Sequence, residues 1–130
     1  MTIQYLMATL ALTAALAGGC KRKEESKAGP ARVPELSDLE KSRSAKACMD
    51  YVFQLCTCAK LKPEAPEIQK RCTLDKALPD ALKVAADIDA DPTAPADAAK
   101  SAADQARKVA ATCIEGLNEL QSDATYRGCN

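Results

Sequence analysis

The residues of this chain best suited to chemistry are its seven cysteines: Cys20, Cys48, Cys56, Cys58, Cys72, Cys113 and Cys129. Cys56 and Cys58 are separated by one residue, a spacing that could serve thiol–disulfide exchange or hold a soft metal ion. Redox enzymes of that kind usually place two cysteines at a helix start beside a strand, and no strand pattern lies near Cys56. The spacing therefore predicts structural disulfides, with a metal–thiolate site and a thiol enzyme as alternatives.

A second group with possible chemistry is the acidic run Asp87-Ile88-Asp89-Ala90-Asp91, which begins like a calcium-binding loop. Such a loop needs glycine at its sixth position and a bidentate glutamate at its twelfth. Those positions hold Pro92 and Ala98. The run is therefore interpreted as a solvated, acidic helix end, and no metal ligand or cofactor is predicted.

The composition excludes several functions. The chain has no histidine, which removes Ser-His-Asp and Cys-His catalysis and histidine metal ligands. Tryptophan is absent, and aromatic residues make up 3% of the chain, so base- or sugar-stacking platforms are not expected. The net charge is zero, which gives no basic surplus for nucleic acid. We expect a protein that is not an enzyme and does not bind nucleic acid.

The N-terminal segment has the pattern of an export signal. Residues 6–16 form a nearly continuous apolar run, and no charged side chain precedes Lys21. A membrane-spanning helix needs about 20 apolar residues, so this run is too short to span. Its length is that of the apolar region of a secretory signal peptide.

The residues after this run, Ala17-Gly18-Gly19-Cys20, resemble the lipobox of bacterial lipoproteins. The resemblance covers residues 1–20 and implies removal of residues 1–19, with diacylglycerol on the sulfur of Cys20 and an acyl chain on its new amine. It implies the bacterial cell envelope as location, with the membrane as partner. Because Lys21 is not aspartate, it points to the outer membrane rather than the inner one.

The number of cysteines supports this interpretation. If lipid occupies Cys20, six cysteines remain, and six can close as three disulfides. Ordinary signal-peptidase cleavage after Ala17 would leave seven, one of them without a partner in an oxidising compartment. That cleavage, giving a soluble secreted protein, and a buried helix of a cytosolic protein are the alternatives. The uncharged segment before the apolar run leaves open a start further upstream.

Residues 20–36 are predicted to be a lipidated N-terminus and flexible tether. The segment from Lys21 to Pro34 is rich in charge, contains two prolines and has few apolar side chains that could order it. The basic Lys21-Arg22-Lys23 cluster would lie beside lipid headgroups.

Residues 37–130 are predicted to be a helical, cysteine-rich domain. Ser37 and Glu40 form a capping-box pattern, and apolar residues then recur every three or four positions to about Leu61. A second helix begins near Pro66 and is either kinked or split at Pro79. A loop is expected at residues 89–94, and Pro95 opens the longest helix.

That last helix carries a regular small and apolar seam: Ala99, Ala103, Ala106, Ala110, Cys113, Leu117 and Leu120. The seam is expected to pack inside the chain, with a coiled coil between copies as the alternative. Short loops between amphipathic helices indicate antiparallel neighbours. The predicted fold is all-α, a small disulfide-stapled antiparallel bundle of three helices, or four if Pro79 splits the second.

Six cysteines allow 15 pairings. Symmetry about the first turn favours Cys58–Cys72, and a last helix parallel to the first favours Cys56–Cys113 and Cys48–Cys129. Exchanging Cys56 and Cys58 gives the alternative.

Together, the export signal, the tether and the lack of a catalytic group predict a lipid-anchored envelope protein, a non-enzymatic module that contacts an unidentified envelope protein. The alternatives are a periplasmic module for a small ligand or metal, and a thiol–disulfide enzyme.

Overall fold

The computed structural model describes residues 32–129, which form four α-helices, one short 3₁₀ turn and no strand. The helices are α1 (Asp38–Leu61), α2 (Pro66–Asp75), α3 (Leu78–Ala90) and α4 (Ala96–Ser122), and the 3₁₀ turn η1 spans Ala124–Tyr126. The all-α prediction is confirmed, and the second predicted helix is two separate helices. The predicted signal peptide, Cys20 and the tether up to residue 31 lie outside the described residues.

The helix starts follow their capping residues. At α1, the Ser37 hydroxyl accepts the N–H of Glu40, and the Glu40 carboxylate accepts the N–H of Ser37 at 2.9 Å, which is the predicted capping box. Pro66 and Pro79 lie in the first turns of α2 and α3, where a missing N–H costs no helical hydrogen bond. Pro79 therefore begins a new helix and does not kink an existing one.

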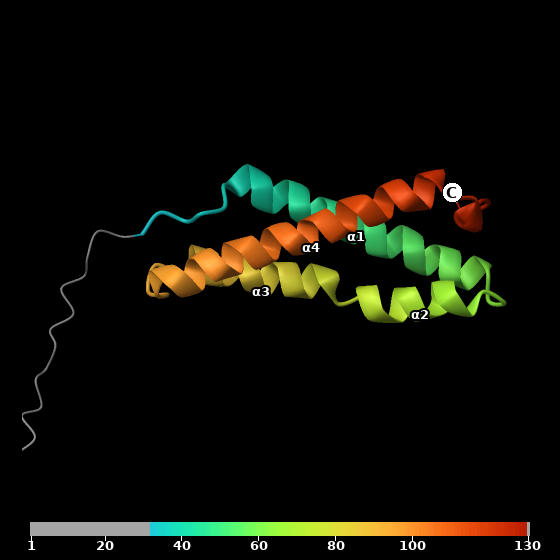
Figure 1. Ribbon diagram of the computed structural model, residues 1–130, viewed down its shortest axis with the longest axis horizontal. Coiled ribbons are helices and arrows are strands. Elements are labelled where there is room, and N and C mark those ends of the chain that lie inside the picture. Colours follow the sequence, from blue (N-terminus) through green and yellow to red (C-terminus); the bar gives the residue numbers. More distant parts are fainter. Residues whose placement is uncertain (1–31, 130) are drawn as a thin grey trace, which may run out of the picture.

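The four helices form an elongated bundle, shown in Figure 1. α1 and α4 run in the same direction, and α2 and α3 follow one another on the return path between them. α4 packs along both α3 and α1, and α2 packs mainly on α1. The predicted antiparallel arrangement of successive long segments is confirmed.

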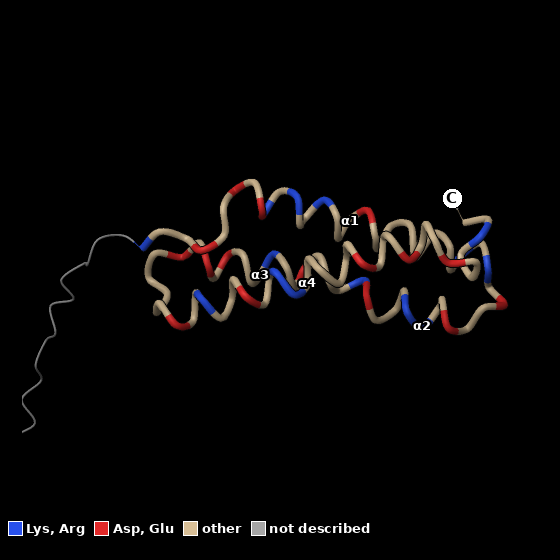
Figure 2. The backbone as a smooth tube through the Cα atoms, turned by 45° about the horizontal axis from the view of Figure 1, so that its top comes forward, with Lys and Arg blue, Asp and Glu red and all other residues tan. Residues whose placement is uncertain are grey.

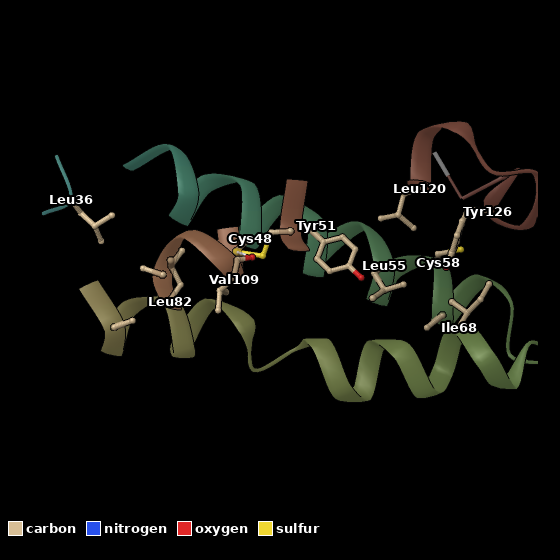
Figure 3. Close-up of a cluster of buried hydrophobic side chains, with 14 of the residues drawn as sticks. Leu36, Cys48, Tyr51, Leu55, Cys58, Ile68, Leu82, Val109, Leu120 and Tyr126 are labelled. Carbon is tan, nitrogen blue, oxygen red and sulfur yellow. Dashed lines mark hydrogen bonds between the residues drawn. A yellow bond between two sulfur atoms is a disulfide. The ribbon is translucent and has the colours of Figure 1, made fainter. Parts of the chain in front are cut away.

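The core lies between α1 and α4 and is covered by α2 and α3 (Figure 3). Its largest fully buried side chains include Tyr51 and Leu55 from α1. Of the seven predicted seam positions on α4, Leu117 is half-buried. The other six are buried: Ala99, Ala103, Ala106, Ala110, Cys113 and Leu120. The seam thus packs inside the chain, as expected.

Three disulfides connect α1 to other parts of the chain: Cys48–Cys113 to α4, Cys56–Cys72 to α2, and Cys58–Cys129 to the C-terminal segment. All six cysteines of the predicted domain are thus paired, but the favoured pairing of Cys58 with Cys72, Cys56 with Cys113 and Cys48 with Cys129 is wrong. The alternative was right in joining Cys56 to Cys72.

The axial register of α4 explains this difference. Cys48 lies ten residues after the start of α1, and its partner Cys113 lies seventeen residues after the start of α4. α4 therefore begins about 10 Å before α1 along the bundle, at 1.5 Å per residue. Cys113 is level with Cys48, so along the bundle axis it lies about 12 Å from Cys56, which is eight residues further along α1.

The C-terminal segment turns back too tightly to reach Cys48. The 3₁₀ turn η1 follows α4 directly, and Gly128 adopts a positive φ of 88°, a backbone conformation that glycine adopts easily. This turn places Cys129 against the end of α1, where it meets Cys58.

Charged residues of both signs are interspersed along the four helices (Figure 2). No helix among residues 32–129 is long and apolar enough to cross a membrane.

Candidate functional site

The Cys56-Thr57-Cys58 pair lies near the C-terminal end of α1, and its two cysteines point to different partners. Cys56 bonds Cys72 on α2, and Cys58 bonds Cys129. The two positions differ by about 200° around the helix, so one faces α2 while the other faces the C-terminal segment. In this oxidised form, none of the cysteines in residues 32–129 offers a thiolate as nucleophile or metal ligand.

The acidic run at the end of α3 does not form a solvated surface throughout, so that interpretation is wrong for its central residue. Asp89 has 0% of its surface exposed, while Asp87 and Asp91 are exposed. No group of three or more acidic or cysteine side chains within residues 32–129 is arranged to hold a metal ion. The Asp89 carboxylate instead serves the backbone.

Asp89 anchors the segment that precedes α1, Arg32–Leu36, which we call the N-terminal strap. Its two carboxylate oxygens accept the N–H of Glu35 at 2.8 Å and the N–H of Leu36 at 3.1 Å. Arg32 and Lys41 place their charged groups 3.7 and 3.8 Å from the same carboxylate. These contacts compensate the cost of burying the charge.

The N-terminal strap corrects the predicted tether. The sequence predicts Leu36 to lie in the flexible segment, but it is only 5% exposed and belongs to the core cluster. The guanidinium of Arg32 also donates to the backbone carbonyl of Asp89. The packed structure therefore includes residues 32–36, which precede Ser37.

A cavity of about 430 Å³ lies between α1, α3 and α4 and is partly closed by the strap. Its wall is mainly apolar and consists of Leu36, Ala45, Pro79, Leu82, Ala86, Ala106, Ala110, Ala111 and Ile114, with Ser44 beside them. Because the alanines contribute only one methyl group each, the space between the helices stays unfilled. Cavities of this size and apolarity are typical of small-molecule sites.

Five charged side chains also line this cavity, and all but Lys41 are well exposed, which puts them on its solvent side, its mouth: Glu40, Lys41, Lys83, Asp87 and Arg107. Lys83 pairs with Asp87 at 2.6 Å along α3. Arg107 of α4 lies 3.5 Å from the Glu40 carboxylate, and one of its N–H groups donates to the Glu35 carbonyl at 3.0 Å. Of the three cations, Lys41 is already used to pair with the buried Asp89 at 3.8 Å.

A second polar group, the Arg71 cluster, joins α2 to the rest of the molecule. The guanidinium donates to Glu119 at 2.6 Å, to the Tyr51 hydroxyl at 3.0 Å and to the Tyr126 hydroxyl at 2.8 Å. It also lies 5.8 Å and 6.0 Å from the two ring centroids, within cation–π distance. The Tyr51 hydroxyl in turn donates to Asp75.

The electrostatics of the Arg71 cluster indicate a structural role. The hydrogen bond from Arg71 lowers the pKa of Glu119, and the same bond raises the pKa of Arg71. Burial, together with the hydrogen bond to Asp75, raises the pKa of Tyr51. All these groups are held in the charge state that they have at neutral pH. The cluster therefore fixes α2 and η1 against α1 and α4.

Sequence reasoning missed both the anchoring role of Asp89 and the cavity. Asp89 had a detectable signal, because it continues the apolar stripe of Leu82 and Ala85 at spacings of three and four. The cavity had a weaker signal, an excess of alanine at predicted core positions.

Comparison with protein-family models, with curated proteins and with solved structures finds no match to this chain.

Proposed function

We propose that this chain is a lipid-anchored protein of the bacterial cell envelope, held by lipid on Cys20, and that residues 32–129 form a non-enzymatic module for contact with another envelope protein. The observation that carries the anchor is the cysteine pairing. All six cysteines of the module are in disulfides, so the odd seventh is Cys20, the residue in the lipobox-like sequence.

The disulfides also support an oxidising compartment. Three disulfides in a small helical module are typical of exported proteins and uncommon in reducing cytosol. The module is short and rich in alanine, so its core buries little apolar surface for each residue. Covalent cross-links then supply stability that burial does not.

The position of the N-terminal strap suggests how such a module would stand on a membrane. The strap lies at the end of the bundle where α3 ends and α4 begins (Figure 1). Since Arg32 is already docked, the residues left between Cys20 and the bundle can span about 40 Å at most. The opposite end, which carries Cys58–Cys129, would face away from the membrane.

Exposed apolar side chains support a protein-contact role. Phe53, the single phenylalanine of the chain, is 73% exposed, and Met49 is 57% exposed. The two lie four residues apart on α1 and are therefore neighbours on its outer surface. An aromatic and a methionine side by side are typical contact residues of protein interfaces.

Cell fractionation with a Cys20→Ser variant tests the anchor. Wild type should enter the membrane fraction, lose residues 1–19 and take up labelled fatty acid, whereas Cys20→Ser should do none of these. Lys21→Ala, next to the modified residue, is the matched control and should behave as wild type. Equal membrane association and labelling of wild type and Cys20→Ser would overturn the anchor.

Site-specific photo-crosslinking in intact cells tests the contact. A crosslinking residue at Phe53 should give one discrete adduct with an envelope protein, and one at Lys76, exposed in the turn after α2, should not. Loss of the adduct in a Met49→Asp background would tie it to the apolar pair. Absence of any adduct at Phe53, or the same adduct at Lys76, would contradict the proposal.

A further inference from the structure

We propose that the cavity between α1, α3 and α4 binds the hydrocarbon chain of a single-chain amphiphile with an anionic headgroup, a fatty acid being the simplest case. This proposal concerns residues 32–129 alone and does not depend on the lipid anchor. It rests on three observations: the apolar wall, the charges at the mouth and the absence of a disulfide to α3.

The wall suits a hydrocarbon chain. Ala45, Ala86, Ala106 and Ala110 line the cavity from three different helices, and Leu36 and Leu82 complete the apolar lining. Hydrocarbon bound there leaves water without leaving a buried polar group unpaired. Each methylene that enters the cavity therefore tightens binding. A polar ligand would find few partners for its hydrogen bonds inside.

The mouth suits an anionic headgroup. Of the three cations there, Lys41 lies 3.8 Å from Asp89 and Lys83 pairs with Asp87 at 2.6 Å, so Arg107 is the residue assigned to the headgroup. Arg107 lies 3.5 Å from Glu40 and 3.7 Å from Asp104, and one of its five N–H groups donates to the Glu35 carbonyl at 3.0 Å. A carboxylate at the mouth could therefore take a closer, bidentate position on Arg107 than either of these side chains does.

One wall of the cavity, α3, carries no disulfide to the rest of the molecule. The disulfides join α1 to α4, to α2 and to the C-terminal segment, and α3 contains no cysteine. α3 is held by packing and by the contacts of Asp89 with the strap, and Leu36 of the strap lines the cavity. Separation of the strap from Asp89 would widen the mouth without breaking a covalent bond.

A second groove, of about 760 Å³, lies between α3 and α4 away from the strap and is lined by Ala81, Val84, Ile88, Ala98 and Ala102 among others. It has no basic residue in its lining. An anionic amphiphile should therefore prefer the first cavity, and a substitution in the groove serves as the control.

The test uses residues 21–130 exported to an oxidising compartment, because the core residues and the disulfides described above lie within 32–129. Binding of dodecanoate, dodecanol and dodecyltrimethylammonium is measured by calorimetry below their micelle concentrations. We expect saturable one-to-one binding of dodecanoate, weaker binding of dodecanol, and the weakest binding of the cationic analogue.

Three variants locate the ligand. Ala110→Leu fills the cavity and should weaken dodecanoate binding by at least about tenfold, which corresponds to a loss of about 1.4 kcal/mol of binding free energy. Ala102→Leu makes the same change in the second groove and should leave binding unchanged. Arg107→Gln should weaken dodecanoate binding and leave dodecanol binding unchanged.

Several results would overturn the proposal: no saturable binding of dodecanoate, equal binding of the cationic analogue, or loss of binding in Ala102→Leu in place of Ala110→Leu. If Ala110→Leu fails to fold, Ala86→Leu fills the same cavity from α3, and the surface variant Arg107→Gln still tests the headgroup. Undiminished binding by a folded cavity-filling variant would refute the site.

Discussion

Gly116 of α4 lies directly against the ring of Tyr51 on α1. A Cβ atom at Gly116 would come 2.6 Å from Cζ of Tyr51, closer than real side chains approach. Tyr51 is fully buried, and its hydroxyl continues into the Arg71 cluster, so the ring cannot easily move away. The absence of a side chain at position 116 thus sets how closely the two long helices approach.

Gly116→Ala should therefore destabilise the protein, although alanine is the better helix former. At an exposed helical site the change would stabilise by about 1 kcal/mol. Here we expect a loss of about 1–3 kcal/mol, the usual cost of overpacking a core. Urea unfolding measures it, with Glu115→Ala on the exposed side of α4 as the control. An unchanged or raised midpoint for Gly116→Ala would show that Tyr51 is not fixed.

Removing the charge of Asp89 should release the N-terminal strap. Asp89→Asn leaves one of the two N–H groups of Glu35 and Leu36 without its acceptor and leaves Arg32 and Lys41 without their anion. The expected cost is about 2–4 kcal/mol, near that of breaking a buried charge pair. Amide hydrogen exchange should accelerate at residues 35 and 36.

Asp87→Asn provides the comparison for this variant, because Asp87 is exposed and makes a surface pair with Lys83. Surface pairs contribute about 0–1 kcal/mol. Similar losses in Asp87→Asn and Asp89→Asn would show that the strap is not held by the buried carboxylate.

The three disulfides should differ in their rates of reduction. Cys48, Cys113 and Cys58 are fully buried, whereas both Cys56 and Cys72 are partly exposed. A thiolate reductant must reach a sulfur atom, so Cys56–Cys72 should be reduced first under native conditions. Timed alkylation with peptide mapping measures this order, and earlier reduction of Cys48–Cys113 would contradict the burial.

Acid should weaken the contact between α2 and α4. The pKa of Glu119 is lowered in the folded protein by its hydrogen bond with Arg71. This pair therefore stabilises the fold fully at pH values above the ordinary glutamate pKa. That contribution is lost as the pH falls through the lowered value. The effect is small, because both side chains are partly exposed and salt screens them.

Glu119→Gln should therefore reduce stability at neutral pH and flatten the acid side of the stability profile. Glu115→Gln, on the exposed face of α4, is the matched control. Unfolding midpoints measured across the acid range in low and high salt give the comparison. An unchanged acid slope in Glu119→Gln would show that Arg71 does not depend on this partner.

The helices were predictable because their signals are local. Ser37 with Glu40, and the prolines at positions 66 and 79, act within one turn of the chain, and the apolar seam of α4 repeats along one helix. These features identify helix starts and buried faces without knowledge of the neighbours. The all-α fold and the inward direction of the seam follow from them.

The disulfide partners and the cavity were not predictable in the same way. Whether Cys113 reaches Cys56 or Cys48 depends on how far α4 slides along α1, which is set by packing across the whole return path of α2 and α3. The cavity at Ala106 and Ala110 depends on how closely three helices approach one another. A periodic pattern gives the direction of a side chain around its helix, and not its level along the bundle.

The burial of the charged Asp89 side chain was not predictable from the sequence either. A carboxylate in an acidic run is usually solvated, and only the arrival of the N-terminal strap gives it two backbone donors. Since the strap precedes Asp89 by more than fifty residues, no local pattern connects them.

The most direct test of the anchored, disulfide-stapled protein is the intact mass of the chain isolated from membranes, before and after reduction and delipidation. The account predicts loss of residues 1–19, a lipid mass on the peptide that begins at Cys20, and a gain of two hydrogens for each of the three disulfides on reduction. A mature chain that begins at Gly18, with an unmodified Cys20, would contradict it.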